Sequence, residues 1–161
     1  MISKKMQDAL NKQINEEMYS SYLYLQMSAW FQSANLCGFA HWMQVQSQEE
    51  TAHAMKLYSH ILQRGGQVAL AAIAEPEAEW ASPLAAFEAA YKHERHITGC
   101  FDKLLALAAQ AKDNAVAVFL QWYVTEQVEE EANASLIVEK LKSIKDAPGG
   151  LIMLDRELAA R

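Results

Sequence analysis

The sequence predicts an all-α protein, a four-helix bundle with one long crossover connection. Glycine (6) and proline (3) are scarce among the 161 residues, and this scarcity favours helix along most of the chain. Apolar residues recur every three to four positions in four long segments, which is the period of an amphipathic helix. One connection between these segments, from residue 67 to residue 81, lacks the period and contains Pro76. A loop this long is unusual in a compact domain unless it crosses the fold.

The first two helices are expected over residues 3–35 and 36–64. Ser3 is a suitable N-cap because its hydroxyl can accept a hydrogen bond from a free backbone N–H group. Gly65 and Gly66 end the second helix, since glycine readily adopts the left-handed conformation that often follows a helix. The tight connection makes the two helices antiparallel neighbours.

The second pair of helices is expected over residues 83–111 and 113–144. Its start is marked by Ser82 and Pro83, a capping hydroxyl followed by proline at the first helical position. This pair is also joined tightly, so the crossover has to run the length of the bundle. Its residues, nearly extended at about 3.5 Å each, just cover the ~45 Å of a thirty-residue helix. These lengths predict one long crossover between the second and third helices.

A short fifth helix is expected after the bundle, over about residues 148–159, behind a hinge that begins at Pro148. Its apolar face consists of Leu151, Leu154 and Leu158. This face has no obvious partner within its own bundle, although it could fold back there. We expect residues 1–161 to form one domain.

The composition excludes several classes of partner. The net charge is -6 and no basic block is present, which argues against nucleic acid or an anionic membrane and mildly favours cations. The chain has neither the apolar run of a signal peptide nor the roughly 18 apolar residues of a membrane span. Cys37 and Cys100 lie far apart and are expected to be reduced structural thiols. We therefore expect a cytoplasmic protein.

Each of the four long helices carries polar residues at the midpoint of an otherwise apolar core stripe. These residues are Glu17 in the first helix, Glu50 and His53 in the second, Glu94 in the third, and Gln127 and Glu130 in the fourth. Helices of similar length share a midpoint in space, whichever way each one runs. The side chains are therefore expected to converge on one level of the interior.

Four carboxylates at that level require compensation. Desolvation costs several kcal/mol per buried ion, against a total folding stability of about 5–15 kcal/mol. No lysine or arginine lies on the stripes nearby, so either the glutamates are protonated or cations accompany them. Two divalent ions would balance four carboxylates. His53 favours a transition metal over Ca²⁺ or Mg²⁺, and its spacing from Glu50 aims both side chains at one ion.

These residues resemble the ferritin family, specifically the non-haem bacterial ferritins, over the whole chain. The segments that carry the resemblance are residues 15–24, 48–53, 91–94 and 119–131. The resemblance implies two iron ions inside each subunit, a first held by Glu17, Glu50 and His53, and a second, bridged by Glu50, held by Glu94 and Glu130.

The resemblance also implies roles around the pair. Gln127 would lie beside the second ion and Tyr24 beside both, and Tyr24 and Trp122 would supply electrons during oxygen reduction. For Trp122, plain aromatic packing is an equally good interpretation. A third iron site is implied next to the pair, with an ordinary solvated acidic face as the alternative. Its residues would be Glu49, Glu126, Glu129 and the shared Glu130.

Two differences separate the chain from similar families. Bacterioferritins and rubrerythrins carry a second Glu-x-x-His on the fourth helix, where this chain has Gln127 and Glu130, so its second ion should be held more weakly. Thr51 stands where a bacterioferritin places its haem-binding methionine, so we expect no haem.

His93 adjoins Glu94 and is a candidate partner of that ligand. The remaining histidines are expected to be structural or on the surface: His41, His60 and His96.

The resemblance implies an iron-storage ferroxidase that oxidises Fe²⁺ with O₂ or H₂O₂ and keeps the ferric mineral in a hollow homo-oligomeric shell, a 24-mer. The apolar run over residues 68–74 of the crossover suits a contact between subunits, as does the face of the fifth helix. Two alternatives remain. One is a redox enzyme that reduces peroxide at the same two metals without storing iron. The other is an interaction bundle whose interior glutamates are protonated.

Overall fold

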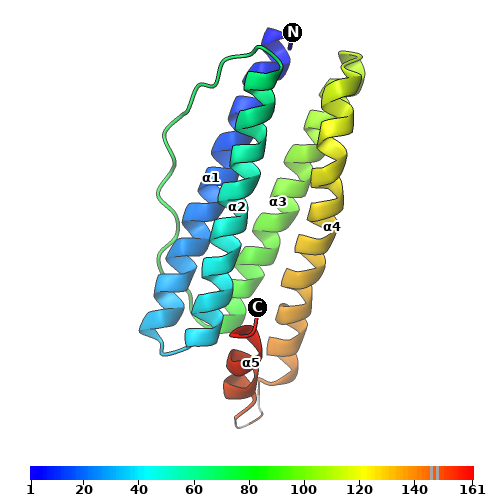
Figure 1. The fold of residues 1–161 in the computed structure, drawn as a ribbon. Helices are drawn as coiled ribbons and strands as arrows, with labels where there is room; N and C mark the ends of the chain where they lie inside the picture. Colours follow the sequence, from blue (N-terminus) through cyan, green and yellow to red (C-terminus); the bar gives the residue numbers. More distant parts are fainter. Residues whose placement is uncertain (146, 148) are drawn as a thin grey trace.

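The computed structural model describes residues 1–145, 147 and 149–161, and these are entirely helix and connection. The helices are α1 Lys4–Ser33, α2 Cys37–Gln63, α3 Pro83–Gln110, α4 Asn114–Ser143 and α5 Gly150–Leu158. The predicted bundle, its single long crossover and the short fifth helix are confirmed (Figure 1). The hinge predicted at Pro148 lies outside the described residues. None of the described helices combines the length and apolarity needed to cross a membrane.

Three helices begin at the residues that the sequence predicts. Ser3, Ser82 and Asp113 each accept a hydrogen bond from the backbone N–H three residues further on, at 3.3, 3.1 and 3.2 Å. Each bond satisfies one of the N–H groups that the first turn of a helix leaves without a partner. The C-terminal end of α2 also lies where the sequence predicts, because Gly65 has a φ of +70°, the left-handed conformation that ends a helix.

The start of α2 is capped by a side chain from α5. Leu36, at the N-cap position, makes no side-chain hydrogen bond. Asp155 Oδ1 accepts instead from the N–H groups of Gly38, at 2.8 Å, and Phe39, at 3.1 Å. Gly38 allows this close approach, because a Cβ there would lie 1.7 Å from the backbone oxygen of Asp155. The fifth helix is therefore anchored to its own bundle.

The apolar face of α5 is covered within the chain. Leu154 and Leu158 are buried and join the cluster that fills this end of the bundle. The expectation that this face has no obvious partner in its own bundle is wrong: the face folds back, the alternative left open, onto the end of the bundle where α2 begins. The exposed apolar residues of α5 are on its other side, where Ile152 and Met153 are 60% and 75% exposed.

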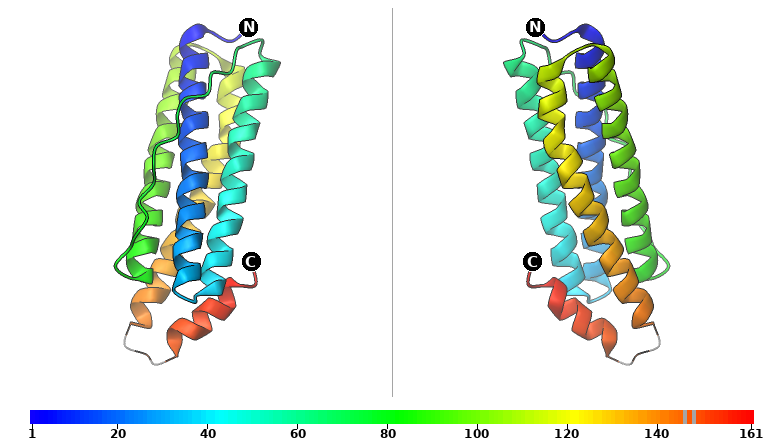
Figure 2. Two further views of the ribbon diagram at one scale, coloured as in Figure 1. Left: turned by 90° about the vertical axis from the view of Figure 1, so that its left-hand side faces the viewer. Right: turned by 90° about the vertical axis from the view of Figure 1, so that its right-hand side faces the viewer.

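The crossover, residues 64–82, runs along α1 from one end of the bundle to the other (Figure 2). Two asparagines one turn apart on α1 hold its backbone. The amide of Asn11 donates to the carbonyl of Gln67 and accepts from the N–H of Ala69, both at 3.0 Å. Asn15 donates to a carbonyl further along at 3.1 Å. These bonds replace the hydrogen bonds that an extended segment otherwise lacks.

The core consists of two separate apolar clusters. The cluster toward α5 includes Phe31, Phe39, Phe87 and Leu141. The cluster toward the start of α1 includes Leu10, Leu57, Phe101 and Leu120. Between these clusters the helices place the polar midpoints of their core stripes, so the hydrophobic interior is interrupted at one level.

We expect Asp155→Ala to release α5 from the start of α2. Loss of a capping acceptor should lower the free energy of unfolding by about 1–2 kcal/mol. Amide hydrogen exchange at Gly38 and Phe39 should become faster, because their N–H groups lose their acceptor. Arg156→Ala, at the neighbouring exposed residue, is the control and should change neither property. Unchanged exchange at both amides in Asp155→Ala would show that the cap does not hold the fifth helix.

Candidate metal centre

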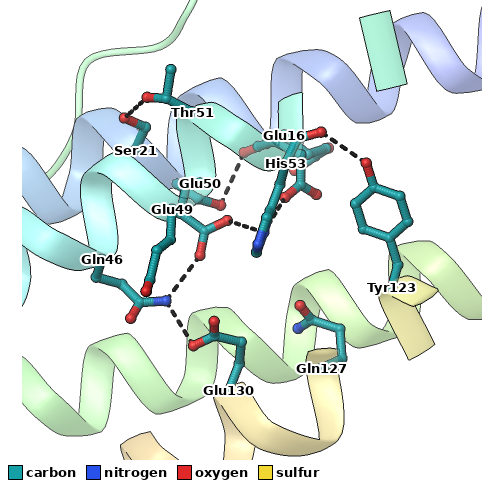
Figure 3. Close-up of polar contacts among 12 residues, drawn as sticks. Glu16, Ser21, Gln46, Glu49, Glu50, Thr51, His53, Tyr123, Gln127 and Glu130 are labelled. Atoms are coloured by element: carbon teal, nitrogen blue, oxygen red, sulfur yellow. Dashed lines mark hydrogen bonds and ion pairs between the residues drawn. The ribbon is translucent and has the colours of Figure 1, made fainter. Parts of the chain in front are cut away.

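All six polar midpoint residues are buried. Their exposed fractions are 0% for Glu17, 2% for Glu50, 6% for His53, 3% for Glu94, 4% for Gln127 and 6% for Glu130. The stretches of α2 and α4 that carry four of them face each other in Figure 3. Carboxylates are almost never this deeply buried without a partner. What compensates their charge is therefore the central question about this level of the bundle.

Glu17, Glu50 and His53 form the tightest group. His53 Nδ1 lies 3.2 Å from Glu50 Oε2 and 3.7 Å from Glu17 Oε2. One donor atom from each of the three side chains lies within 4.8 Å of the other two. Glu17 Oε2 and His53 Nδ1 are buried and have no hydrogen-bond partner among the residues that the structure describes. Such atoms are costly, and a metal ion between the three side chains would satisfy them.

Two glutamines hold the carboxylates from one turn away. Gln46 Nε2 donates to Glu130 Oε2 at 2.7 Å and to Glu50 Oε1 at 3.1 Å, so it links α2 with α4 (Figure 3). Gln13 Nε2 donates to Glu17 Oε1 at 2.6 Å. Neither glutamine was predicted from the sequence as a site residue. Each lies four residues before a glutamate of the centre, the spacing of neighbours on a helix face, and that pattern could have identified them.

Glu94 is held by two other donors. The hydroxyl of Tyr24 donates to Glu94 Oε1, and Gln127 Nε2 donates to Glu94 Oε2 at 3.2 Å. Tyr24 and Gln127 thus both lie against the carboxylate that was predicted to bind the second ion. Burial and the charge of Glu94 raise the pKa of Tyr24 well above its usual value, so its phenol keeps its proton.

The carboxyl groups are poor acids in this interior. Burial raises the pKa of Glu50 to about 7, and the negative charge of Glu17 adds to the effect. Burial likewise raises the pKa of Glu94 to about 7, with the charge of Glu50 adding to it. Burial and the negative charge of Glu94 raise the pKa of Glu130 to about 8. Burial alone would lower the pKa of His53, but Glu17 and Glu50 outweigh it and raise that pKa to about 10. Without a cation, the centre therefore retains protons at neutral pH.

No lysine or arginine of the described chain forms an ion pair with Glu17, Glu50, Glu94 or Glu130. The basic side chain that comes near is Arg161. Its guanidinium donates to Gln46 Oε1 at 2.8 Å and to Glu49 Oε2 at 2.5 Å, and it stacks on Trp42. Compensation of the buried carboxylates is thus left to His53, to protons or to metal ions.

The residues of the predicted third site are less buried than the midpoint residues, apart from the shared Glu130. Glu49 is half-buried and pairs with Arg161, Glu126 is half-buried, and Glu129 is exposed. Among the described residues, they form no group of three donors within 4.8 Å of one another. A third ion would require Arg161 to release Glu49.

Aromatic rings surround the histidine of the centre. The Trp122 ring meets His53 edge-on at 5.2 Å between centroids, and the ammonium of Lys56 lies 3.3 Å from the centroid of Trp122. The hydroxyl of Tyr123 donates to the backbone oxygen of His53 at 2.8 Å (Figure 3). His93, a candidate partner of Glu94, forms a 2.7 Å hydrogen bond with Ser20.

Comparison with known proteins places these residues in a family. A family model described as a ferritin-like domain matches residues 7–144. A bacterial non-heme ferritin of Bacteroides fragilis is 46% identical over 161 residues, which is 100% of both chains. A bacterial non-heme ferritin of Staphylococcus saprophyticus is 38% identical over 100% of this chain and 96% of its own.

Solved structures agree with the sequence relatives. The open pore ferritin of the hyperthermophilic archaeon Archaeoglobus fulgidus superposes with a TM-score of 0.99 at 54% identity, over 100% of this chain and 99% of that one. A closed form of that ferritin, engineered by site-directed mutagenesis, has the same TM-score and identity. Family model, sequence relatives and solved structures all extend over most or all of the sequence, and the chain belongs to the ferritin family.

Proposed function

We propose that the chain is an iron-storage ferroxidase whose substrate, Fe²⁺, is oxidised between the four long helices. Membership of the ferritin family supports iron storage. One observation carries the ferroxidase assignment: four glutamates and a histidine are buried together, and no lysine or arginine of the described chain is paired to these glutamates. Anionic oxygen ligands with one imidazole suit iron and other transition metals.

The side chains suggest how two ferrous ions are held. Glu17, Glu50 and His53 would bind the first, because their donor atoms already lie within 4.8 Å of one another. Glu94 and Glu130 would bind the second, with Glu50 between them. Four carboxylates then balance the four positive charges of two Fe²⁺ ions.

Each bound ion supplies one electron in this proposal. Two Fe²⁺ become two Fe³⁺ while H₂O₂ and two protons become two waters, or while O₂ and two protons become H₂O₂. Carboxylate oxygens favour the ferric product because they are hard and negatively charged. The protons that Glu50, Glu94 and Glu130 hold in the metal-free chain leave as the ions bind. Tyr24 lies close enough to Glu94 to act as an additional electron donor. The ammonium of Lys56 lies over the Trp122 ring and disfavours the positive charge that loss of an electron would leave on that ring.

Gln127 lowers the expected affinity of the second site for its ion. A neutral amide beside Glu94 contributes no negative charge, so the second ion would be held less tightly than the first. Weak binding there would let ferric product leave for storage. We also propose a third iron site at Glu49, Glu126 and Glu129, with Glu130 shared, which is filled only after Arg161 has moved away from Glu49.

Storage requires an enclosed space, and we propose a homo-oligomeric shell, a 24-mer, in the cytoplasm. Exposed apolar side chains support contacts between subunits. In the crossover, Leu70 and Ile73 are 72% and 40% exposed, and on α4, Val118 and Val128 are 74% and 71% exposed. A monomer of ordinary solubility has few such side chains in clusters.

We expect Glu50→Ala to abolish rapid iron oxidation and leave the shell assembled. Loss of even an outer partner of a metal ligand costs about 10–100-fold, so loss of the bridging ligand should slow oxidation at least about 100-fold. Stopped-flow absorbance after mixing with Fe²⁺ and O₂ measures the rate, and particle mass reports the assembly. Glu88→Ala, at an exposed glutamate of α3, is the control. Fast oxidation in Glu50→Ala would refute the assigned role.

Gln127→Glu should tighten the second site. The substitution adds a carboxylate beside Glu94, so titration with Fe²⁺ under anaerobic conditions should show stronger binding of the second equivalent. Release of ferric product after oxidation should become slower. If the second equivalent binds unchanged while the first tightens, Gln127 belongs to the first ion instead.

Metal binding should release protons and strengthen as the pH rises from about 6 to about 8. In the unfolded chain the carboxyl groups ionise near their usual pKa of about 4.3, whereas in the folded chain the pKa values of Glu50, Glu94 and Glu130 are about 7, about 7 and about 8. The folded metal-free chain thus binds more protons than the unfolded one, and its free energy of unfolding should fall as pH rises through this window.

The pKa of His53, raised to about 10, acts in the same direction above about pH 6.5. Saturating Zn²⁺, which binds without redox chemistry, should remove most of this decline. Calorimetric titration in buffers of different ionisation enthalpy measures the protons released. An interaction bundle with protonated glutamates would show the decline in stability but take up no metal, and that result would exclude the proposed function.

A further inference from the structure

A second group of metal-binding side chains lies between α1 and α3, apart from the buried centre. Glu16 comes from α1, and His96 and Cys100 come from α3. His96 Nε2 is 3.0 Å from Glu16 Oε2 and 3.6 Å from Cys100 Sγ. One donor atom of each residue lies within 4.8 Å of the other two. His96 and Cys100 are four residues apart, so they share one helix face.

These distances are close to those of a metal coordination sphere. In a tetrahedral zinc site, bond lengths of about 2.0–2.3 Å put nitrogen and sulfur ligands about 3.6 Å apart, and nitrogen and oxygen ligands about 3.4 Å apart. The observed 3.6 Å between His96 and Cys100 matches the first separation. The observed 3.0 Å between His96 and Glu16 needs an adjustment of a few tenths of an ångström, and Glu16 is a flexible, half-buried side chain.

The three donors face open space. A pocket of about 260 Å³ is lined by Glu16, His96 and Cys100, together with Lys12, Gln13 and Lys103. This volume has room for an ion and its water, so a fourth ligand can come from solvent. Gln13 also donates to Glu17 Oε1 of the buried centre. Gln13 therefore lies between the two sites, and the sites have no ligand in common.

The charges of the pocket suit a divalent ion bound by a thiolate. Burial and the neighbouring Glu16 raise the pKa of Cys100, so its thiol is neutral when nothing is bound. Lys12 and Lys103 act in the opposite direction and favour the thiolate. An M²⁺ ion with the Cys100 thiolate and the Glu16 carboxylate forms a site of zero net charge, which a partly buried surface accommodates easily.

We propose that Glu16, His96 and Cys100 bind one divalent ion of borderline softness, with the chemistry of Zn²⁺, and that a water molecule completes its tetrahedron. A ligand set of thiolate, imidazole and carboxylate is the one such ions prefer, whereas the carboxylate-rich centre between the helices suits iron. The site stands independently of the ferroxidase assignment, because none of its donors belongs to the buried centre.

Co²⁺ is the probe for this site, because cobalt bound to a thiolate has a near-ultraviolet charge-transfer band that oxygen and nitrogen ligands do not produce. Titration of the full protein with Co²⁺ should produce this band, saturating at one ion per subunit, and Zn²⁺ should then abolish it. Co²⁺ in the buried centre is silent in this band, since no cysteine lies among its predicted ligands.

The two cysteines provide matched variants. Cys100→Ser should lose the band, whereas Cys37→Ser, at the exposed cysteine that begins α2, should keep it. Glu16→Gln and His96→Ala should each weaken Co²⁺ binding at least about tenfold, as loss of one protein ligand of three requires. Absence of the band in the unmodified protein, or its survival in Cys100→Ser, would overturn the proposal and leave Glu16 and His96 as an ordinary ion pair.

Discussion

The charge of four glutamates enclosed between two apolar clusters is the constraint on which the rest of the structure depends. An ordinary bundle would continue its hydrophobic core through this level. Here the two apolar clusters are separated by a level of carboxyl groups. Burial raises the pKa values of these groups, so they hold their protons more tightly than they would in water. The fold tolerates this arrangement because long helices anchor the level from both sides. The apolar clusters at the two ends of the bundle thus provide the stability, and the reactive carboxyl groups lie between them.

Much of the fold and of the buried centre is visible in the sequence for a simple reason. Helix periodicity places Glu17, Glu50, His53, Glu94 and Glu130 on the same stripes as the leucines and phenylalanines, and helices of similar length align their midpoints. Capping residues such as Ser3 and Asp113 mark helix starts through local bonds alone. Where the determining interaction was local or periodic, the fold could be predicted from the sequence, although the glutamines Gln13 and Gln46, one turn before glutamates of the centre, were missed.

Interactions between distant segments could not be predicted in this way. Arg161 reaches Glu49 across 112 positions of the chain, and Asp155 caps a helix that begins 118 positions before it. Glu16 was overlooked and His96 was expected to be structural or on the surface, because both lie off the core stripes, on helices whose relative rotation the sequence does not reveal. The same limitation explains the error about α5, whose apolar face finds its partner only when the bundle's end is seen in three dimensions.

The glutamine amides that hold the carboxylates have a further consequence. Gln13 and Gln46 keep Glu17, Glu50 and Glu130 in fixed positions through neutral hydrogen bonds. If iron binds there as proposed, an arriving ion would meet side chains whose rotamers are already restricted, and binding would cost less conformational entropy. Because an amide carries no charge, it can yield to a cation without leaving an unpaired ion behind. The two amides thus preorganise the carboxylates for the reversible binding of cations that we propose.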